Sequence, residues 1–176
     1  MMLFVRKFDN FIISRTPFKH QNTLLDRIMI CITCMGNGGL IWIIISTFLW
    51  LLTPYKIAAL SVLLALVMSS ILGEGLIKHC VKRIRPCNVD KSIKILISKP
   101  ASYSFPSGHT FSSFAAANML YLYFNNTGII FFILAFLISI SRVYLRVHYP
   151  TDVLGGVLLG ILCSKLLFIV LQYNLI

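Results

Sequence analysis

Long apolar runs separated by short polar segments dominate the chain from residue 28 onward. A helix that crosses a membrane needs about 20 mostly apolar residues. The runs predict five membrane-spanning helices, at residues 28–52, 57–77, 108–124, 128–147 and 151–171. We therefore expect an all-α fold, a polytopic membrane helix bundle of about five transmembrane helices.

Glycine and other small residues mark places where these helices should bend or approach one another. The glycine-rich stretch 36–39 interrupts the first run and predicts a kink. The run at 108–124 is rich in Ala and Ser, which favours close contacts with other helices over contacts with lipid. We interpret Gly156-x3-Gly160 in the last run as packing within the chain rather than as a dimerisation motif.

Residues 1–27 mix aromatic, aliphatic and basic side chains, which is typical of a segment that lies at the membrane surface. We expect two units, an interfacial amphipathic arm at 1–27 and a membrane domain at 28–176. No small-residue cleavage site follows the first apolar run, so we expect no cleavable signal peptide. Five crossings place the arm and the segments 78–107 and 141–152 on one face of the membrane.

The composition agrees with a membrane protein. Of 176 residues, 58% are hydrophobic and 12% are charged, whereas soluble domains carry about 25% charged residues. The net charge is +11. Because the basic residues cluster between apolar runs, anionic lipids or a phosphate substrate are the expected partners, and nucleic acid is not. Cys31-x2-Cys34 lies in an apolar run, so we interpret both cysteines as buried packing residues rather than a metal or redox pair.

Lys78 and Arg85 stand seven residues apart at the end of the second run, directly before Pro86. On a helix this spacing puts both cations on one face, and we expect Pro86 to end the helix or turn the chain away. A lysine and an arginine can bind phosphate oxygens together. Contacts with lipid headgroups are the alternative, and we expect them for the neighbouring Lys82 and Arg83.

Glu74 precedes Lys78 by four residues, which favours an ion pair on one helix face. A carboxylate inside a membrane helix is also a candidate functional group in its own right. The sequence leaves open which of the two roles Glu74 has.

Pro106-Ser107-Gly108-His109 opens the third run. A serine before a helix can cap its first turn, and the free N–H groups of that turn favour an anion. Gly108 allows a ligand to approach the backbone closely, which would put His109 beside the ligand. An ordinary capped helix with a histidine at the interface is the alternative.

Ser141-Arg142-x5-His148-x3-Asp152 connects the fourth and fifth runs. A carboxylate four residues after His148 can accept the N–H of one ring nitrogen and leave the other nitrogen free as a nucleophile. Arg142 adds a third cation. A structural His–Asp pair is the alternative, but the presence of all three motifs favours a site for phosphoryl transfer.

Together the three motifs resemble the signature of the type 2 phosphatidic acid phosphatase (PAP2) superfamily, and every specified position matches. The resemblance extends over about residues 20–171, although its specificity lies in the three motifs. The common six-span form has a further hydrophobic helix before the arm. We expect this chain to lack that helix. It is therefore similar to small bacterial members, including those that act on undecaprenyl pyrophosphate.

The resemblance implies a metal-independent phosphatase that works through a phosphohistidine intermediate and needs no cofactor. The implied substrate is a lipid phosphate such as undecaprenyl pyrophosphate, phosphatidylglycerophosphate or phosphatidic acid. It also implies that His148 is the nucleophile, Asp152 its orienting partner and His109 the general acid. The residues implied to bind the phosphate are Lys78, Arg85, Ser107, Gly108 and Arg142.

Two other functions are consistent with the same motifs. A vanadate-dependent haloperoxidase shares the site, but such enzymes are typically soluble. A non-catalytic scaffold or transporter with a relic site should have lost a key residue, and none is missing.

Two arguments about the membrane face oppose each other. The crossing count puts all basic residues except Lys56 and Lys165 on the face of the motifs, which the positive-inside rule assigns to the cytoplasm. The resemblance instead favours the outer face of the plasma membrane, which we expect.

Overall fold

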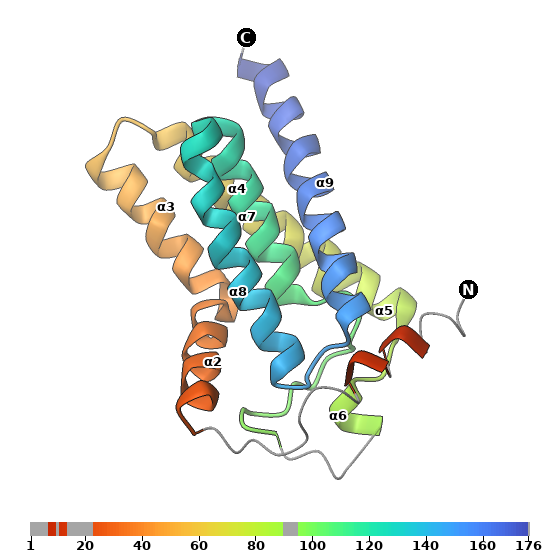
Figure 1. Ribbon diagram of the computed structural model, residues 1–176. Coiled ribbons are helices and arrows are strands. Elements are labelled where there is room, and N and C mark those ends of the chain that lie inside the picture. The colour runs from red at the N-terminus through yellow and green to blue at the C-terminus, as the bar shows by residue number, and fades with distance from the viewer. Residues whose placement is uncertain (1–6, 10, 14–22, 90–94, 176) are drawn as a thin grey trace.

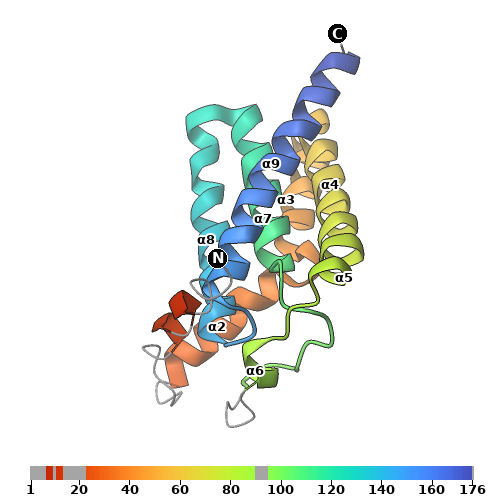
Figure 2. The same cartoon turned by 90° about the vertical axis from the view of Figure 1, so that its right-hand side faces the viewer.

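The computed structural model describes residues 7–9, 11–13, 23–89 and 95–175, and it contains no strand within these ranges (Figure 1). Helices that run side by side form a bundle, as Figures 1 and 2 show. They are α3 (Leu40–Leu52), α4 (Lys56–Ser70), α7 (Gly108–Phe124), α8 (Ile130–Tyr144) and α9 (Pro150–Leu175). The prediction of an all-α membrane helix bundle is confirmed.

Within the described residues, three helical stretches are long and apolar enough to cross a membrane, namely Lys56–Val81, Gly108–Tyr144 and Pro150–Tyr173. A bent pair, Leu24–Met35 with Asn37–Leu52, makes a fourth if it is one span. The longest stretch turns back at the 3₁₀ turn η3 (Asn125–Ile129), so α7 and α8 lie antiparallel (Figure 2). The number of crossings would be five if the bent pair is one span and α7 and α8 cross separately, so the exact count of five stays a prediction.

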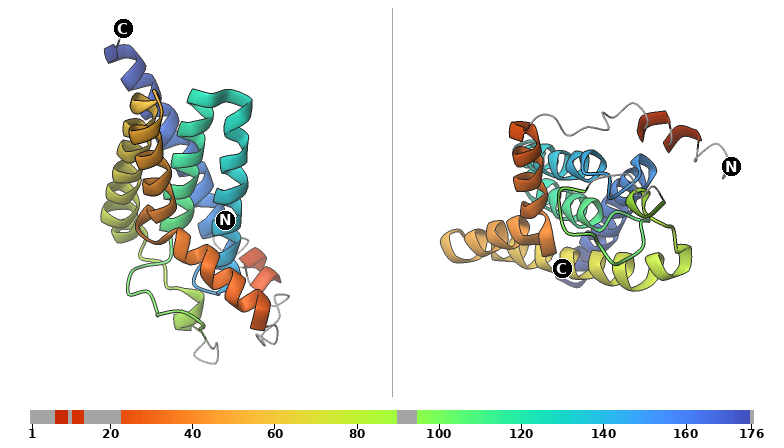
Figure 3. Two further views of the ribbon diagram at one scale, coloured as in Figure 1. Left: turned by 90° about the vertical axis from the view of Figure 1, so that its left-hand side faces the viewer. Right: turned by 90° about the horizontal axis from the view of Figure 1, so that it is seen from below.

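The first predicted span is broken rather than gently kinked. Helix α2 (Thr23–Met35) meets the next segment at an angle of 53°, and η1 (Asn37–Gly39) forms the corner. Gly38 and Gly39 have φ values of 57° and 74°, which glycine adopts without steric cost. Helix α2 therefore leaves the bundle obliquely at one end (Figure 3). It also runs through the boundary at 27/28, and the division into arm and domain stays a prediction.

Helix α7 is the centre of the bundle and packs against α4, α8 and α9. Its residues Ala115, Ala116 and Ala117 are fully buried. Trp42 of α3 reaches the same helix and donates a hydrogen bond through Nε1 to Ser113 Oγ at 3.0 Å. The small residues expected at close helix contacts therefore lie in the core, as predicted.

Gly156 and Gly160 bring α9 against α7. A Cβ atom at Gly160 would lie 2.7 Å from the carbonyl oxygen of Phe111 and 2.9 Å from the amide nitrogen of Ala115. A Cβ atom at Gly156 would lie 3.0 Å from the carbonyl oxygen of Ser107. The interpretation of this motif as packing within the chain is confirmed, and the close approach sets the start of α9 beside the start of α7.

The second span does not continue to Pro86 as expected. Helix α4 passes through a π-helical segment, η2 (Ile71–Ile77), into the short helix α5 (Lys78–Val81). Lys82 has a left-handed backbone conformation with φ 49° and ends the helix. Pro86 instead begins the next short helix, α6 (Pro86–Val89), a position where its missing N–H costs nothing.

Residues 7–9 and 11–13 of the arm, the described residues after α5 and the turn before α9 lie at one end of the bundle (Figures 1 and 3). A direct contact shows this, because Arg83 pairs with both Asp9 of the arm and Asp152 of α9. The described residues of these three segments therefore lie at the same end of the bundle, as predicted, and the remaining residues of the arm lie outside the described ranges.

We predict that Gly160→Ala destabilises the protein, because its methyl group would collide with the backbone of α7. Overpacking of this kind costs about 1–3 kcal/mol of the free energy of unfolding. Gly75→Ala is the matched control, since nothing lies within 4 Å of its Cβ position. Thermal unfolding in detergent should show a lower midpoint for Gly160→Ala only. Equal midpoints would contradict the close packing of α7 and α9.

Candidate active site

Lys78 and Arg85 meet through the loop before α7, and not through a shared helix face. Ser102 Oγ accepts hydrogen bonds from Lys78 Nζ at 3.0 Å and from Arg85 Nη2 at 3.1 Å. The Ser102 carbonyl oxygen accepts a further bond from Arg85 Nε at 2.7 Å. The helical reasoning was wrong because the helix ends at Lys82. Sequence analysis missed Ser102, which holds the two buried cations together.

Glu74 forms the expected ion pair with Lys78. The carboxylate lies in the π-helical segment η2, where one extra residue per turn shifts the register just before Lys78. A Cβ atom at Gly108 would overlap Glu74 Oε1. The glycine is therefore needed for this carboxylate to approach the start of α7, and not only for a ligand.

Ser107 precedes α7 but does not cap it with its side chain. Its hydroxyl oxygen accepts a hydrogen bond from Thr110 Oγ1 at 3.0 Å instead, so the predicted capping interaction is wrong. The Ser107 amide donates to the carbonyl oxygen of Asp152 at 3.1 Å. This bond joins the start of α7 to the start of α9, and Ser107 is fully buried there.

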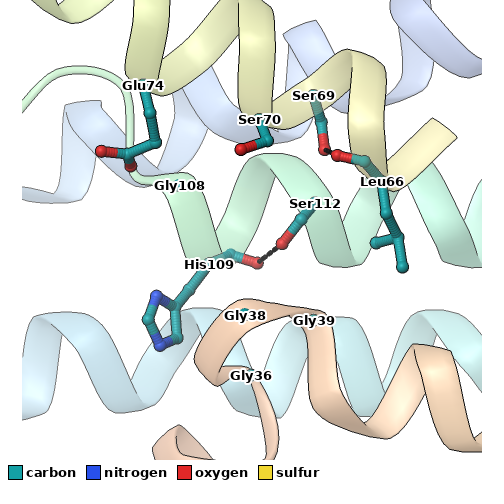
Figure 4. A pocket seen from close by; sticks show the side chains of 10 residues that line it. All are labelled: Gly36, Gly38, Gly39, Leu66, Ser69, Ser70, Glu74, Gly108, His109 and Ser112. Carbon is teal, nitrogen blue, oxygen red and sulfur yellow. Dashed lines mark hydrogen bonds between the residues drawn. The ribbon is translucent and has the colours of Figure 1, made fainter. Parts of the chain in front are cut away.

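His109 projects from the first turn of α7 towards the corner between α2 and α3, as Figure 4 shows. Its Nε2 atom lies 2.9 Å from Asn37 Oδ1, so the amide of Asn37 fixes the ring. A pocket of about 260 Å³ lies beside the ring, between η1, α4, η2 and α7. Its lining residues are Gly36, Gly38, Gly39, Leu66, Ser69, Ser70, Glu74, Gly108, His109 and Ser112.

Arg142 extends from the last turn of α8 into the site and is 4% exposed. Its Nη1 atom donates to Thr33 Oγ1 of α2 at 2.5 Å. Its Nε atom is buried and has no hydrogen-bond partner among the described residues. A buried guanidinium nitrogen without a partner is unfavourable unless an anion binds beside it.

His148 lies between a cation and a carboxylate and is 2% exposed. Arg85 Nη1 donates to its Nε2 atom at 2.9 Å, and the Nδ1 atom lies 3.6 Å from Asp152 Oδ2. The bond from Arg85 requires a lone pair on Nε2, so the proton of the neutral ring is on Nδ1 and faces the carboxylate. Nε2 therefore faces the cations, although the Asp152 contact is slightly longer than a hydrogen bond.

The Asp152 carboxylate is fully buried and bound on both oxygens. Ser104 Oγ donates to Oδ2 at 2.5 Å, and so does the Tyr149 amide at 2.9 Å. The second bond resembles half of a capping box, in which an acidic residue in the first turn caps the residue before the helix. Sequence analysis did not identify Ser104, which joins the loop before α7 to this carboxylate.

Arg83 was expected to extend to lipid headgroups, and that prediction was wrong. Its Nη1 atom donates to Asp152 Oδ1 at 2.6 Å. The guanidinium also stacks on the Tyr149 ring, with 4.1 Å between Cζ and the ring centroid. Lys82 differs from its neighbour in being exposed.

The site combines cations and a neutral imidazole. Burial lowers the pKa of His148 to about 3, because the desolvated imidazolium is disfavoured more than Asp152 can compensate. Burial also lowers the pKa of Arg85, so an anion bound beside it would relieve the desolvation of its charge. Such a site can grip an anion while His148 keeps an unprotonated Nε2, whose lone pair accepts the hydrogen bond from Arg85.

The described residues contain no group of three or more His, Cys, Asp or Glu side chains that could hold a metal ion. Cys31 and Cys34 have free thiols and are exposed on α2. The interpretation of these two cysteines as buried packing residues was therefore wrong.

A family model described as "PAP2 superfamily" matches residues 54–176. The chain belongs to the PAP2 superfamily. The match includes all three motifs, and the parts of the chain that it leaves out are the arm, α2 and α3.

Curated relatives of this PAP2 chain cover most of its length. The chain is 32% identical to the undecaprenyl-diphosphatase of Sulfolobus acidocaldarius over 80% of its own residues and 68% of the relative. It is also 32% identical to the "Bacitracin transport permease protein BcrC" of Bacillus licheniformis, over 66% of its own residues. The chain spans only 57% of the length of that protein.

Two solved PAP2 phosphatases share the fold, each with a TM-score of 0.75. The Bacillus subtilis phosphatidylglycerolphosphate phosphatase is 28% identical and is aligned over 97% of this chain and 87% of its own. Aquifex aeolicus LpxE is 27% identical and is aligned over 92% of this chain and 93% of its own. The overall fold of this chain is therefore one that these two crystal structures also contain.

We predict that His148 makes the protein less stable in acid. Its pKa falls from an ordinary 6.5 to about 3 on folding. Between these values the unfolded chain binds a proton that the folded chain does not, so stability falls as the pH falls. Thermal midpoints in detergent at about pH 7.5 and about pH 5 should therefore differ more in the wild type than in His148→Gln. Equal losses in both proteins would contradict a buried neutral imidazole.

Proposed function

We propose that the chain is an integral membrane lipid phosphate phosphatase, which hydrolyses a phosphomonoester or diphosphate of a lipid through a phosphohistidine intermediate. The observation that supports this most strongly is the environment of His148. Its Nε2 atom faces the guanidinium of Arg85 at 2.9 Å, while Nδ1 faces the buried carboxylate of Asp152. A neutral imidazole next to buried cations can bind and attack a phosphate.

In this proposal the cations grip the phosphate before any bond changes. Lys78, Arg85 and Arg142 neutralise its oxygens, which is the main requirement of phosphoryl transfer. The Ser107 hydroxyl and the amide groups at the start of α7, from Gly108 onward, donate further hydrogen bonds. The Nε atom of Arg142 supports this assignment, because it is buried without a hydrogen-bond partner in the described part of the chain and would be stabilised by an anionic ligand.

Two displacement steps then complete the reaction. His148 Nε2 attacks phosphorus, the bond to the lipid oxygen breaks, and a protonated His109 gives its proton to that oxygen. Water then attacks the phosphohistidine and transfers a proton to His109, which releases inorganic phosphate and restores His148. Asp152 orients the ring and stabilises the positive charge that develops on it in the first step.

The pocket beside His109 is suited to the part of the lipid nearest the broken bond. It borders both the proposed acid and Gly108 of the phosphate site. Three serines and Glu74 make much of its lining polar, and no lysine or arginine is among the lining residues. We propose that the leaving group occupies this pocket and that the lipid tail continues between the helices.

The names of the relatives suggest a short list of substrates to compare. They are an undecaprenyl diphosphatase, a phosphatidylglycerophosphatase B from Bacillus subtilis and lipid A 4'-phosphatases. Undecaprenyl pyrophosphate, phosphatidylglycerophosphate and lipid A are therefore candidates, and phosphatidic acid, which the sequence motifs imply, is the fourth lipid to compare.

We predict that the purified protein releases phosphate from at least one of these lipids and that His148→Ala abolishes the release. Turnover should persist in excess EDTA, because the cations of the site supply the positive charge. His79→Ala is the matched control, since this exposed histidine contacts the Gly75 carbonyl at 3.1 Å and the Tyr103 ring edge-on, and neither belongs to the proposed phosphate site. Unchanged turnover in His148→Ala, or activity lost in EDTA and restored by Mg²⁺, would contradict the mechanism.

We also propose that the site lies at the outer face of the plasma membrane. The positive-inside rule opposes this, but several basic residues at this end are held in the site and do not reflect topology alone. Lys78, Arg85, Arg142 and Arg146 are buried, and Arg83 is paired.

A pair of single cysteines in a cysteine-free background tests the face. Asn88 is exposed near the site, whereas Asn126 is exposed in the turn at the opposite end. We predict that an impermeant thiol reagent added to intact cells labels Asn88→Cys and spares Asn126→Cys. The reverse pattern would put the site in the cytoplasm.

A further inference from the structure

Arg83 connects the proposed catalytic pair to the N-terminal arm. Its Nη1 atom lies 2.6 Å from Asp152 Oδ1, and its Nη2 atom lies 2.5 Å from Asp9 Oδ2. Arg83 Nη1 also donates to Thr151 Oγ1 at 2.8 Å. One guanidinium therefore bridges two carboxylates, Asp9 and Asp152, that are 143 residues apart in the sequence.

Asp9 is bound on both sides of its carboxylate, although it comes from a short segment of the arm. It is 1% exposed. Its Oδ1 atom accepts a hydrogen bond from the Thr151 amide at 3.1 Å, and its Oδ2 atom accepts one from Thr151 Oγ1 at 2.7 Å. The Thr151 amide belongs to the first turn of α9, where N–H groups have no partner within the helix. Asp9 thus holds both the start of α9 and Arg83.

The two oxygens of Asp152 have separate partners. Arg83 binds Oδ1, whereas Oδ2 receives Ser104 and the Tyr149 amide and faces His148 Nδ1. A carboxylate that is held at one oxygen cannot rotate freely about its Cβ–Cγ bond. The bond from Arg83 to Oδ1 therefore acts together with the two bonds to Oδ2 in setting which oxygen His148 meets, and at what angle.

We propose that Arg83 is a positioning residue for the Asp152–His148 pair and that Asp9 positions Arg83, so that the N-terminal arm is part of the active site. This inference rests on the proposed phosphatase activity. Arg83 does not touch the phosphate in this scheme. It acts through Asp152, and a small misplacement of a catalytic group can reduce turnover by about 100-fold.

Vanadate tests positioning separately from stability. It mimics the five-coordinate phosphorus of the transition state, so its binding depends on the alignment of His148. A variant that is merely less stable contains fewer active molecules, but its inhibition constant for vanadate is unchanged. Vanadate affinity can also be read from the rise in the thermal midpoint, which needs no knowledge of the substrate.

We predict that Arg83→Gln lowers kcat by about 10- to 100-fold with little change in KM, and weakens vanadate binding by a similar factor. Arg83→Lys keeps the charge but not the planar fork, and should recover part of both losses. Asp9→Asn should also lower kcat and weaken vanadate binding, but by a smaller factor than Arg83→Gln. The double variant should be no worse than Arg83→Gln, because both residues act along one path.

Two matched controls should behave like the wild type. Lys82→Gln removes the adjacent positive charge, which is exposed. Asp26→Asn removes another buried carboxylate, which accepts a hydrogen bond from the Tyr144 hydroxyl at 2.7 Å and does not contact Asp152.

Three results would contradict us in distinguishable ways. Unchanged vanadate affinity in Arg83→Gln would overturn the positioning role, whatever happens to kcat. Wild-type behaviour of Asp9→Asn would remove the arm from the active site. A wild-type protein that binds vanadate but hydrolyses no lipid phosphate would overturn the proposed function and leave the Arg83 result readable by thermal shift.

Discussion

The buried carboxylate of Asp152 is the interaction on which the rest of the site depends. Removing a carboxylate from water costs several kcal/mol unless charged groups and hydrogen bonds replace the solvent. Arg83, Ser104 and the Tyr149 amide supply these partners. They come from the segment after α5, the loop before α7 and the turn before α9, so the burial of one charge fixes three segments around His148.

The balance of charges at this end of the bundle explains how a cationic site can be buried. The chain has only five acidic residues, and three of them, Asp9, Glu74 and Asp152, pair with cations beside the site. Arg142 has no acidic partner among these ion pairs, and its Nε atom is unpartnered in the described residues. Paired charges thus build the frame, while the remaining positive charge is available for a phosphate.

The sequence predicted the helices better than it predicted the loop contacts that hold the proposed reacting groups. Helix α7 begins and ends where its apolar run does, at Gly108 and Phe124, because length and periodicity determine a membrane helix. Ser102 and Ser104 lie in an irregular loop whose path has no periodic signal. Asp9 is an acidic residue in a basic arm, which is a weak signal of a buried ion pair. Its partner Arg83 lies 74 residues further along the chain, and local sequence patterns do not reveal such a distant contact.

The position of phosphate on the trapped enzyme tests the central claim most directly. His148 presents Nε2 to Arg85 and Nδ1 to Asp152, so only Nε2 can attack a phosphate held by the cations. After rapid acid-free quenching of turnover with a labelled lipid phosphate, we expect mass spectrometry and phosphorus NMR to find phosphate on Nε2 of His148. Phosphate on Nδ1, on another residue, or on no residue while turnover continues would contradict this arrangement of the site.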